Sequence, residues 1–232
     1  MTQPVGNTAF FADSADDDEL ELRNAVFWEA MLDHIRRDGF AQAPRRVLDI
    51  GCHRGGLLAR IADLWGPAEL IGIEPIVTAR SRARLRLGAL APSVQLLAPD
   101  EWSKVSGSAV DLIVCHEVLF LIPDLADLVA TIARVLAPGG RAYVAAGCHA
   151  ENPIWPAWQQ ALEAQGRRTF THEPMAFMAA ASSHGMLSSV RPLRDGGWAT
   201  HDPTDGSFTF PTVAALLDHQ FRHKLLFRLV NR

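Results

Sequence analysis

A short segment in the first quarter of the chain has the composition of a ligand-binding turn. Residues 47–56 read Val-Leu-Asp-Ile-Gly-Cys-His-Arg-Gly-Gly, so an apolar stretch that carries Asp49 runs into a glycine-rich turn. Glycine lets the backbone approach a ligand without a Cβ in the way. Glu74 follows Gly51 by 23 residues, where a carboxylate can accept hydrogen bonds from both hydroxyls of a ribose. Together these residues suit a ligand that contains adenosine.

The turn differs from the one that binds a dinucleotide. A dinucleotide site needs the spacing Gly-x-Gly-x-x-Gly to place the pyrophosphate on a helix N-terminus, and this turn lacks that spacing. Asp49 precedes the turn instead, as expected where the end of the ligand is a cationic amino acid. Pro99-Asp100-Glu101 follows a later apolar stretch and could accept from an adenine amino group. An NAD(P)-dependent oxidoreductase is therefore disfavoured.

Taken together, these segments resemble the class I S-adenosylmethionine-dependent methyltransferases over residues 46–148. The matching motifs are V-L-D-I-G-C-x-x-G at 47–55, Glu74, Asp100, E-V-L-F-L-I-P-D at 117–124 and L-A-P-G-G at 136–140. The resemblance implies that Asp49 and Gly51 hold the methionine end of the cofactor and that Glu74 holds the ribose. It implies that Asp100 and the backbone of Glu101 hold the adenine. Further cofactor contacts are expected from residues in or beside these turns: Cys52, His53, Gly55, Pro75 and His116. The family usually has glycine at the position of His53.

Two histidines lie where such an enzyme needs a base. Methyl transfer from a sulfonium is an in-line displacement, so the protein mainly supplies alignment, dry surroundings and a base if the acceptor carries a proton. His116 and His149 come at the ends of the apolar stretches 110–115 and 142–146, which are expected to face the methyl group. Both are candidate catalytic residues, and a structural or solvated histidine is the alternative for each.

Each of the three cysteines is followed by a histidine, in Cys52-His53, Cys115-His116 and Cys148-His149. Thiolate and imidazole groups that converge on one edge of a sheet could hold zinc or another soft metal. A metal and the cofactor would compete for the same space, so we expect no metal.

The tryptophans and the sequence at 115–118 favour a small acceptor. Four tryptophans lie outside the cofactor-binding part, on segments that usually cover the active site in small-molecule methyltransferases: Trp28, Trp155, Trp158 and Trp198. They predict an aromatic-lined acceptor pocket, with plain core packing as the alternative. Residues 115–118 read Cys-His-Glu-Val and lack the Asn/Asp-Pro-Pro-aromatic tetrad of many DNA, RNA and glutamine methyltransferases.

The elements that position these residues follow an alternating pattern. Short apolar stretches at 46–50, 70–73, 94–97, 110–115 and 142–146 predict strands, separated by helical patterns at 56–64, 76–87 and 125–136. Unalternated apolar strands are typical of a parallel sheet buried on both faces. Further patterns predict helices at 156–165, 173–184 and 212–221, and strands at 186–193 and 224–230.

The predicted fold class is therefore α/β, with a Rossmann-like doubly wound sheet. The resemblance implies seven strands with the last, 224–230, antiparallel. Residues 1–40 are expected to form an N-terminal tail and a capping helix, with the helical pattern over 20–38. Residues 41–232 are expected to form one domain, with a cofactor core at 46–148. Segments 149–175 and 195–222 are expected to form a C-terminal insertion that covers the active site.

Composition narrows the class of protein further. The chain has 232 residues with 48% apolar and 21% charged side chains, which excludes a disordered or fibrous protein. Its formal net charge of −4 argues against binding nucleic acid through bulk charge. The apolar stretches are too short to span a membrane, and the N-terminus is acidic, unlike a secretory signal. A cytoplasmic protein without a nucleic-acid or membrane partner is expected.

The sequence thus predicts an enzyme that transfers the methyl group of S-adenosylmethionine to a nitrogen or oxygen atom of a small, partly apolar metabolite. Two alternatives stay open. One is a related methyltransferase that acts on RNA or protein, and the other is a module that binds S-adenosylmethionine or a nucleotide without turnover.

Overall fold

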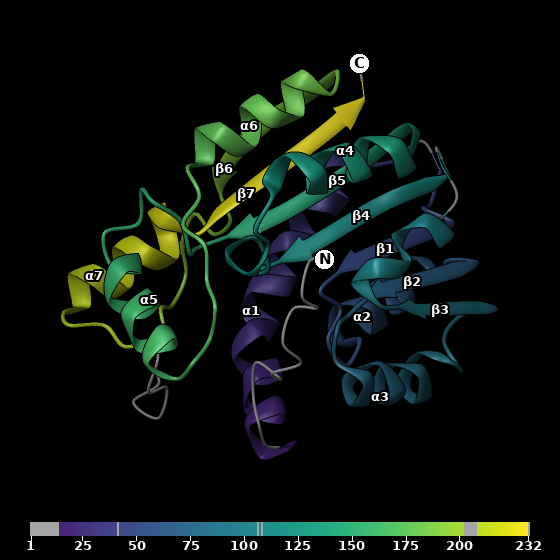
Figure 1. The fold of residues 1–232 in the computed structure, drawn as a ribbon. Helices are drawn as coiled ribbons and strands as arrows, with labels where there is room; N and C mark the ends of the chain where they lie inside the picture. Colours follow the sequence, from purple (N-terminus) through teal and green to yellow (C-terminus); the bar gives the residue numbers. More distant parts are fainter. Residues whose placement is uncertain (1–13, 41, 106, 108, 202–207, 232) are drawn as a thin grey trace.

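A seven-stranded sheet forms the centre of the computed structural model, which describes residues 14–231 except residues 41, 106, 108 and 202–207 (Figure 1). The strand order is β3-β2-β1-β4-β5-β7-β6. The strands are β1 (Arg46–Ile50), β2 (Glu69–Ile73), β3 (Ser93–Leu97), β4 (Val110–His116), β5 (Leu136–Ala146), β6 (Met186–Pro192) and β7 (Leu225–Asn231). β1 to β5 pair in parallel, and β7 is antiparallel to both of its neighbours, β5 and β6. The predicted seven-stranded sheet with an antiparallel last strand is confirmed.

Helices cover both faces of this sheet. α1 (Ser14–Asp38), α2 (Gly56–Trp65) and α3 (Val77–Leu87) pack on one face, where their apolar side chains meet strand residues such as Val47 and Leu112. α4 (Leu125–Val135) and α6 (Pro174–Ser183) pack on the other face, against residues such as Leu48 and Ile113. Successive residues of a strand point to opposite faces, so both of its faces must be apolar here. This explains the unalternated apolar stretches.

α1 begins at Ser14, six residues before the predicted start of the helix. The apolar pattern does not mark the first residues of this helix, because ion pairs hold that part of α1 in place. Asp18 and Glu21 pair with Arg54 in the turn after β1, and Glu21 also pairs with Arg86 on α3. Residues 1–13, which the sequence predicts to be a tail, lie outside the described residues.

β5 begins at Leu136, six residues before the predicted start of this strand. Its first residue pairs with Val110 of β4, and the register then shifts before the regular pairing begins at Leu112. Gly140 makes the shift possible, because a Cβ at this position would come 2.9 Å from Val110 O. The motif at 136–140 therefore ends α4, with Leu136 as its C-cap, and also forms the irregular start of β5.

The C-terminal insertion forms a separate small cluster. α5 (Trp155–Ala164) and α7 (Val213–Asp218) lie on the side of the sheet where β4 and β5 end and β7 begins (Figure 1). The predicted helix 212–221 is split, because α7 continues as a π-helical turn over His219–His223. Residues 202–207 of the predicted covering segment lie outside the described residues. No helix in the described ranges is long and apolar enough to cross a membrane.

Candidate cofactor and acceptor site

Two buried carboxylates lie at the ends of neighbouring strands β1 and β2. Asp49 and Glu74 are both shielded from solvent. Burial, together with the charge of Glu74, raises the pKa of Asp49 to about 8. The Glu74 carboxylate accepts hydrogen bonds from the backbone N–H groups of His53 (3.0 Å) and Ile76 (2.8 Å). A cation beside Asp49 would favour its ionised form, so the site suits a ligand that carries an ammonium group.

The turn after β1 has a backbone that favours glycine at three positions. Gly51, His53 and Gly55 all have positive φ, at +79°, +47° and +77°. His53 therefore keeps the left-handed conformation that suits the glycine usual in the family, although its side chain makes that conformation costly. The turn thus has at His53 a conformation that glycine would adopt without this cost.

The structure also shows what lies beside these glycines within the protein. The space beside Gly51 is filled by a protein side chain, because an added Cβ would collide with Val118. An added Cβ on Gly55 would come 2.9 Å from Leu87. Cys52 likewise packs against Gly72 of β2. In this structure the small residues of the turn serve close packing within the protein.

The other predicted cofactor residues lie at the ends of β2 and β3. Pro75 and Asp100 are exposed, and Asp100 lies in the first turn of the 3₁₀ helix η1 (Pro99–Lys104). Glu101 accepts from the backbone N–H of Ala98 at 2.8 Å and pairs with Lys104. Lys104 and the Ala98 N–H hold the pKa of Glu101 below its usual value. Asp49, Glu74 and Asp100 thus lie at or just after the ends of β1, β2 and β3. These three strands are adjacent in the sheet, as the parallel order predicts.

His116 lies at the end of β4 beneath α1. Its ring centroid is 6.2 Å from that of Phe27 and 6.3 Å from that of Trp28. Burial, and then the charge of Lys224, lowers the pKa of His116 to about 3. Its buried Nε2 has no hydrogen-bond partner among the described residues. His116 is therefore a neutral imidazole in a dry, aromatic environment.

Beside His116 lies a buried ion pair that the sequence did not reveal. Lys224 Nζ is 2.9 Å from Glu117 Oε1, and both side chains are mostly buried. Glu117 Oε2 accepts from the Gly147 N–H at 3.1 Å. Burial alone would raise the pKa of Glu117, but Lys224 and His116 lower it to about 2. Glu117 also has a positive φ of +54°, an uncommon conformation that concentrates at functional sites.

His149 and His219 complete this polar cluster on the other side. His149 Nε2 donates to His223 O at 2.6 Å, which leaves its buried Nδ1 without a partner among the described residues. Asn152 Nδ2 donates to Gly147 O at 2.6 Å and to His219 Nδ1 at 3.0 Å. Burial, with the charge of nearby Lys224, lowers the pKa of His219 to about 3. His149 and His219 both approach the end of β5, as the predicted strand order requires for His149.

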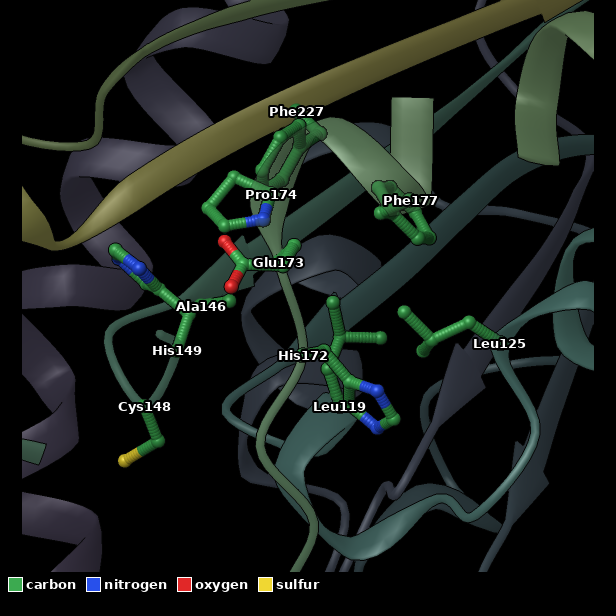
Figure 2. A pocket seen from close by; sticks show the side chains of 10 residues that line it. All are labelled: Leu119, Leu125, Ala146, Cys148, His149, His172, Glu173, Pro174, Phe177 and Phe227. Carbon is green, nitrogen blue, oxygen red and sulfur yellow. The ribbon is translucent and has the colours of Figure 1, made fainter. Parts of the chain in front are cut away.

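A small apolar cavity lies next to His149 (Figure 2). Its walls come from Ala146 at the end of β5, Phe177 on α6 and Phe227 on β7. The cavity holds about 10 Å³, which is room for one water molecule and too little for an acceptor.

Trp155 and Trp158, two tryptophans of the insertion, form core packing. Trp155 and Trp158 are buried in one aromatic cluster, in which Trp158 packs edge-on against Phe210 and His219. Their indole N–H groups donate within the insertion, to Thr171 Oγ1 and Thr209 O. Trp198 is 91% exposed. Of the four tryptophans, Trp28 is the one that lies against His116.

The three Cys-His pairs do not converge. In the part of the chain that the structure describes, no group of three or more His, Cys, Asp or Glu side chains could hold a metal ion. The three thiols are buried, and burial raises the pKa of each one. They act as small apolar side chains at the strand ends.

Comparison with known proteins agrees with this architecture. Residues 23–180 match a family model described as a methyltransferase domain. The ubiquinone biosynthesis O-methyltransferase of Sodalis glossinidius is 28% identical over 175 residues, which cover 74% of this chain and 65% of that protein. The trans-aconitate 2-methyltransferase of Methylobacterium radiotolerans is 35% identical over 99 residues, which cover 43% of this chain and 36% of that protein. The chain thus spans less than two thirds of the length of these relatives.

Solved structures share the fold at low sequence identity. A chain from the Haloferax volcanii complex with the Trm112 methyltransferase activator aligns with a TM-score of 0.71 and 20% identity, over 93% of this chain and 94% of that one. Geranyl diphosphate C-methyltransferase from Streptomyces coelicolor, in complex with S-adenosylhomocysteine, aligns with a TM-score of 0.64 and 19% identity, over 89% of this chain and 76% of that one.

Proposed function

The chain belongs to the class I S-adenosylmethionine-dependent methyltransferase family, and on this basis we propose that it transfers a methyl group to a small, partly apolar metabolite. The acceptor atom in this proposal is oxygen or nitrogen. One of the relatives reported above is named as an O-methyltransferase, which favours oxygen.

The observation that carries the proposal is the buried pair of Asp49 and Glu74. When bound, S-adenosylmethionine supplies a methyl group activated by its sulfonium. Asp49, with its raised pKa, would face the ammonium group of the methionine end, and ionisation of Asp49 would then be favoured by that charge. Glu74, at the end of β2, already accepts from the backbone N–H groups of His53 and Ile76 and would accept from the ribose hydroxyls as well. Asp100 and the Glu101 backbone would contact the adenine.

The acceptor side of the proposal rests on His116 and His149. Each offers a buried ring nitrogen without a partner among the described residues, at the ends of β4 and β5. A ring nitrogen in that place can take the proton that an O–H or N–H acceptor must lose. Phe27 and Trp28 of α1 would exclude water from the same space. A site buried under a helix favours a small acceptor over RNA or a protein.

A thermal-shift panel tests the proposal. S-adenosylhomocysteine should raise the melting temperature and NAD should not, because a ligand that binds only the native state stabilises it. Methyl-labelled S-adenosylmethionine should then label a molecule of a metabolite extract. Stabilisation without any labelled product would favour a binding module, and stabilisation by NAD alone would contradict the cofactor.

A further inference from the structure

Two buried cations lie on the ring of Phe27, on α1. Lys224 Nζ is 3.7 Å from the ring centroid, and the guanidinium carbon of Arg194 is 5.8 Å from it. Glu117 provides one carboxylate, 2.9 Å from Lys224. Arg194 donates to uncharged oxygens, Gln220 Oε1 at 2.7 Å and Trp198 O at 2.8 Å. Among the described residues, one positive charge of this group therefore has no ion-pair partner.

Lys224 has hydrogen-bonding capacity to spare. An ammonium group has three N–H donors, and Glu117 is the one acceptor that pairs with it in the described part of the chain. The Lys224 side chain is only 7% exposed, so bulk water satisfies little of the remainder. A buried cation in this state calls for a further acceptor.

His219 offers a second donor at the same place. Because its Nδ1 accepts from Asn152, its ring proton lies on Nε2. A Cβ added to Gly147 would lie 2.7 Å from His219 Cε1 and 3.0 Å from Glu117 Oε1. The imidazole of His219 and the Glu117–Lys224 pair therefore lie close together at the end of β5, where both pack against Gly147.

We propose that Lys224 Nζ and His219 Nε2 together bind a carboxylate group of the methyl acceptor. Glu117 and Asn152 act as positioning residues, which fix the ammonium group and the imidazole tautomer. The inference rests on the proposed methyltransferase function and gives its acceptor class, a small organic acid. The carboxylate would supply the negative charge that the cations around Phe27 lack.

Fractionation of acceptors by charge tests this class. A deproteinised metabolite extract is separated by anion exchange at neutral pH, and each fraction is incubated with the protein and methyl-labelled S-adenosylmethionine. Label should enter molecules of the retained fraction, also after phosphatase treatment, which removes phosphate esters and leaves carboxylates. Label in the unretained fraction, or label that phosphatase treatment abolishes, would overturn the inference.

The same assay separates failure of the inference from failure of the proposed function. If the protein binds S-adenosylhomocysteine but labels neither fraction, no organic acid is accepted and the inference fails. If it does not bind S-adenosylhomocysteine at all, the proposed function fails first.

A charge-neutral double variant tests the residues. Lys224→Met with Glu117→Gln keeps the side-chain volumes and removes both charges of the ion pair together. The KM for the acid should rise about 10- to 100-fold, with the affinity for S-adenosylhomocysteine unchanged. The matched control is Arg222→Met with Asp218→Asn, which removes an exposed ion pair of 3.3 Å near Lys224 and should leave KM unchanged. Wild-type KM in the Lys224/Glu117 variant would contradict the carboxylate contact.

Discussion

The indole ring of Trp28, on α1, lies so close to Gly56, the first residue of α2, that a Cβ on Gly56 would come within 2.8 Å of two ring carbons. Asp18 and Glu21 of the same helix form ion pairs with Arg54, two residues earlier in the turn. These contacts fix α1 against the turn after β1, where we propose that the cofactor binds. The position of the helix and the shape of the turn are thus coupled.

Gly56→Ala should destabilise the protein by about 1–3 kcal/mol, the usual cost of overpacking a tight contact, because the indole ring must move. Thermal denaturation measures the effect as a fall in Tm. Gly196→Ala is the control, since no described atom lies within 4 Å of the Cβ that it would add. Equal melting temperatures for the two variants would contradict the close contact with Trp28.

The left-handed backbone of His53 makes a comparison of two small residues informative. His53→Gly and His53→Ala both remove the imidazole, so they differ mainly in whether a Cβ must adopt a φ of +47°. His53→Gly should be more stable than His53→Ala by about 1 kcal/mol. Urea denaturation measures the difference, and an alanine variant as stable as the glycine variant would contradict the conformation.

Replacing one partner of the buried ion pair should lower the free energy of unfolding much more than replacing both partners. Lys224→Met alone leaves the Glu117 carboxylate buried without its cation, for an expected loss of about 3–5 kcal/mol. Adding Glu117→Gln should restore most of that loss. Denaturant titrations of both variants provide the measurement, and equal stability of the single and the double variant would show that the pair is not buried as described.

The same pair predicts a response to acid. Because Lys224 and His116 hold the pKa of Glu117 at about 2, below its ordinary value, this carboxylate stabilises the fold at neutral pH. The contribution is lost as the pH falls from the ordinary pKa of a glutamate towards about 2. The Lys224→Met/Glu117→Gln variant should therefore lose less stability than the wild type on acidification, as Tm values measured along a pH series would reveal. If the Tm of the wild type and that of the variant fell in parallel with pH, the stabilising role of the Glu117 carboxylate would be contradicted.

Removal of the candidate bases should act on the rate. If the acceptor must lose a proton, His116→Gln or His149→Gln should lower kcat by about 100-fold or more at a saturating acceptor concentration. Binding of S-adenosylhomocysteine, measured in parallel, controls for damage to the cofactor site. Full rates in both variants would mean that neither histidine is the base.

Local patterns in the sequence were enough to predict the parallel strands of the sheet and the meeting of Asp49 and Glu74 at one edge. Asp49 and Glu74 follow buried strands, and parallel strands bring their ends to one edge, so the two carboxylates meet. The antiparallel position of the last strand came from the family resemblance. The positions of residues that directly end or follow a predicted strand could thus be predicted from the sequence.

The acceptor side depends on contacts between distant parts of the chain. Lys224 reaches Glu117 because β7 inserts next to β5, and no local pattern marks Lys224 as buried. The early start of α1 was missed for the same reason, since its ion partners Arg54 and Arg86 lie on other elements. The one sequence feature that could have drawn attention to Lys224 is the scarcity of lysine, because the chain has only two, Lys104 and Lys224.

Titration calorimetry with S-adenosylhomocysteine, in two buffers of different ionisation enthalpy at about pH 6.5, measures whether the site of Asp49 and Glu74 binds the cofactor. Because burial and Glu74 raise the pKa of Asp49 to about 8, Asp49 is protonated in the free protein at that pH. The ammonium group of the ligand should lower this pKa, so binding should release about one proton. Asp49→Asn should abolish the release. We expect one bound ligand per chain, with a heat that depends on the buffer. The absence of any binding heat in either buffer would contradict the proposed cofactor site.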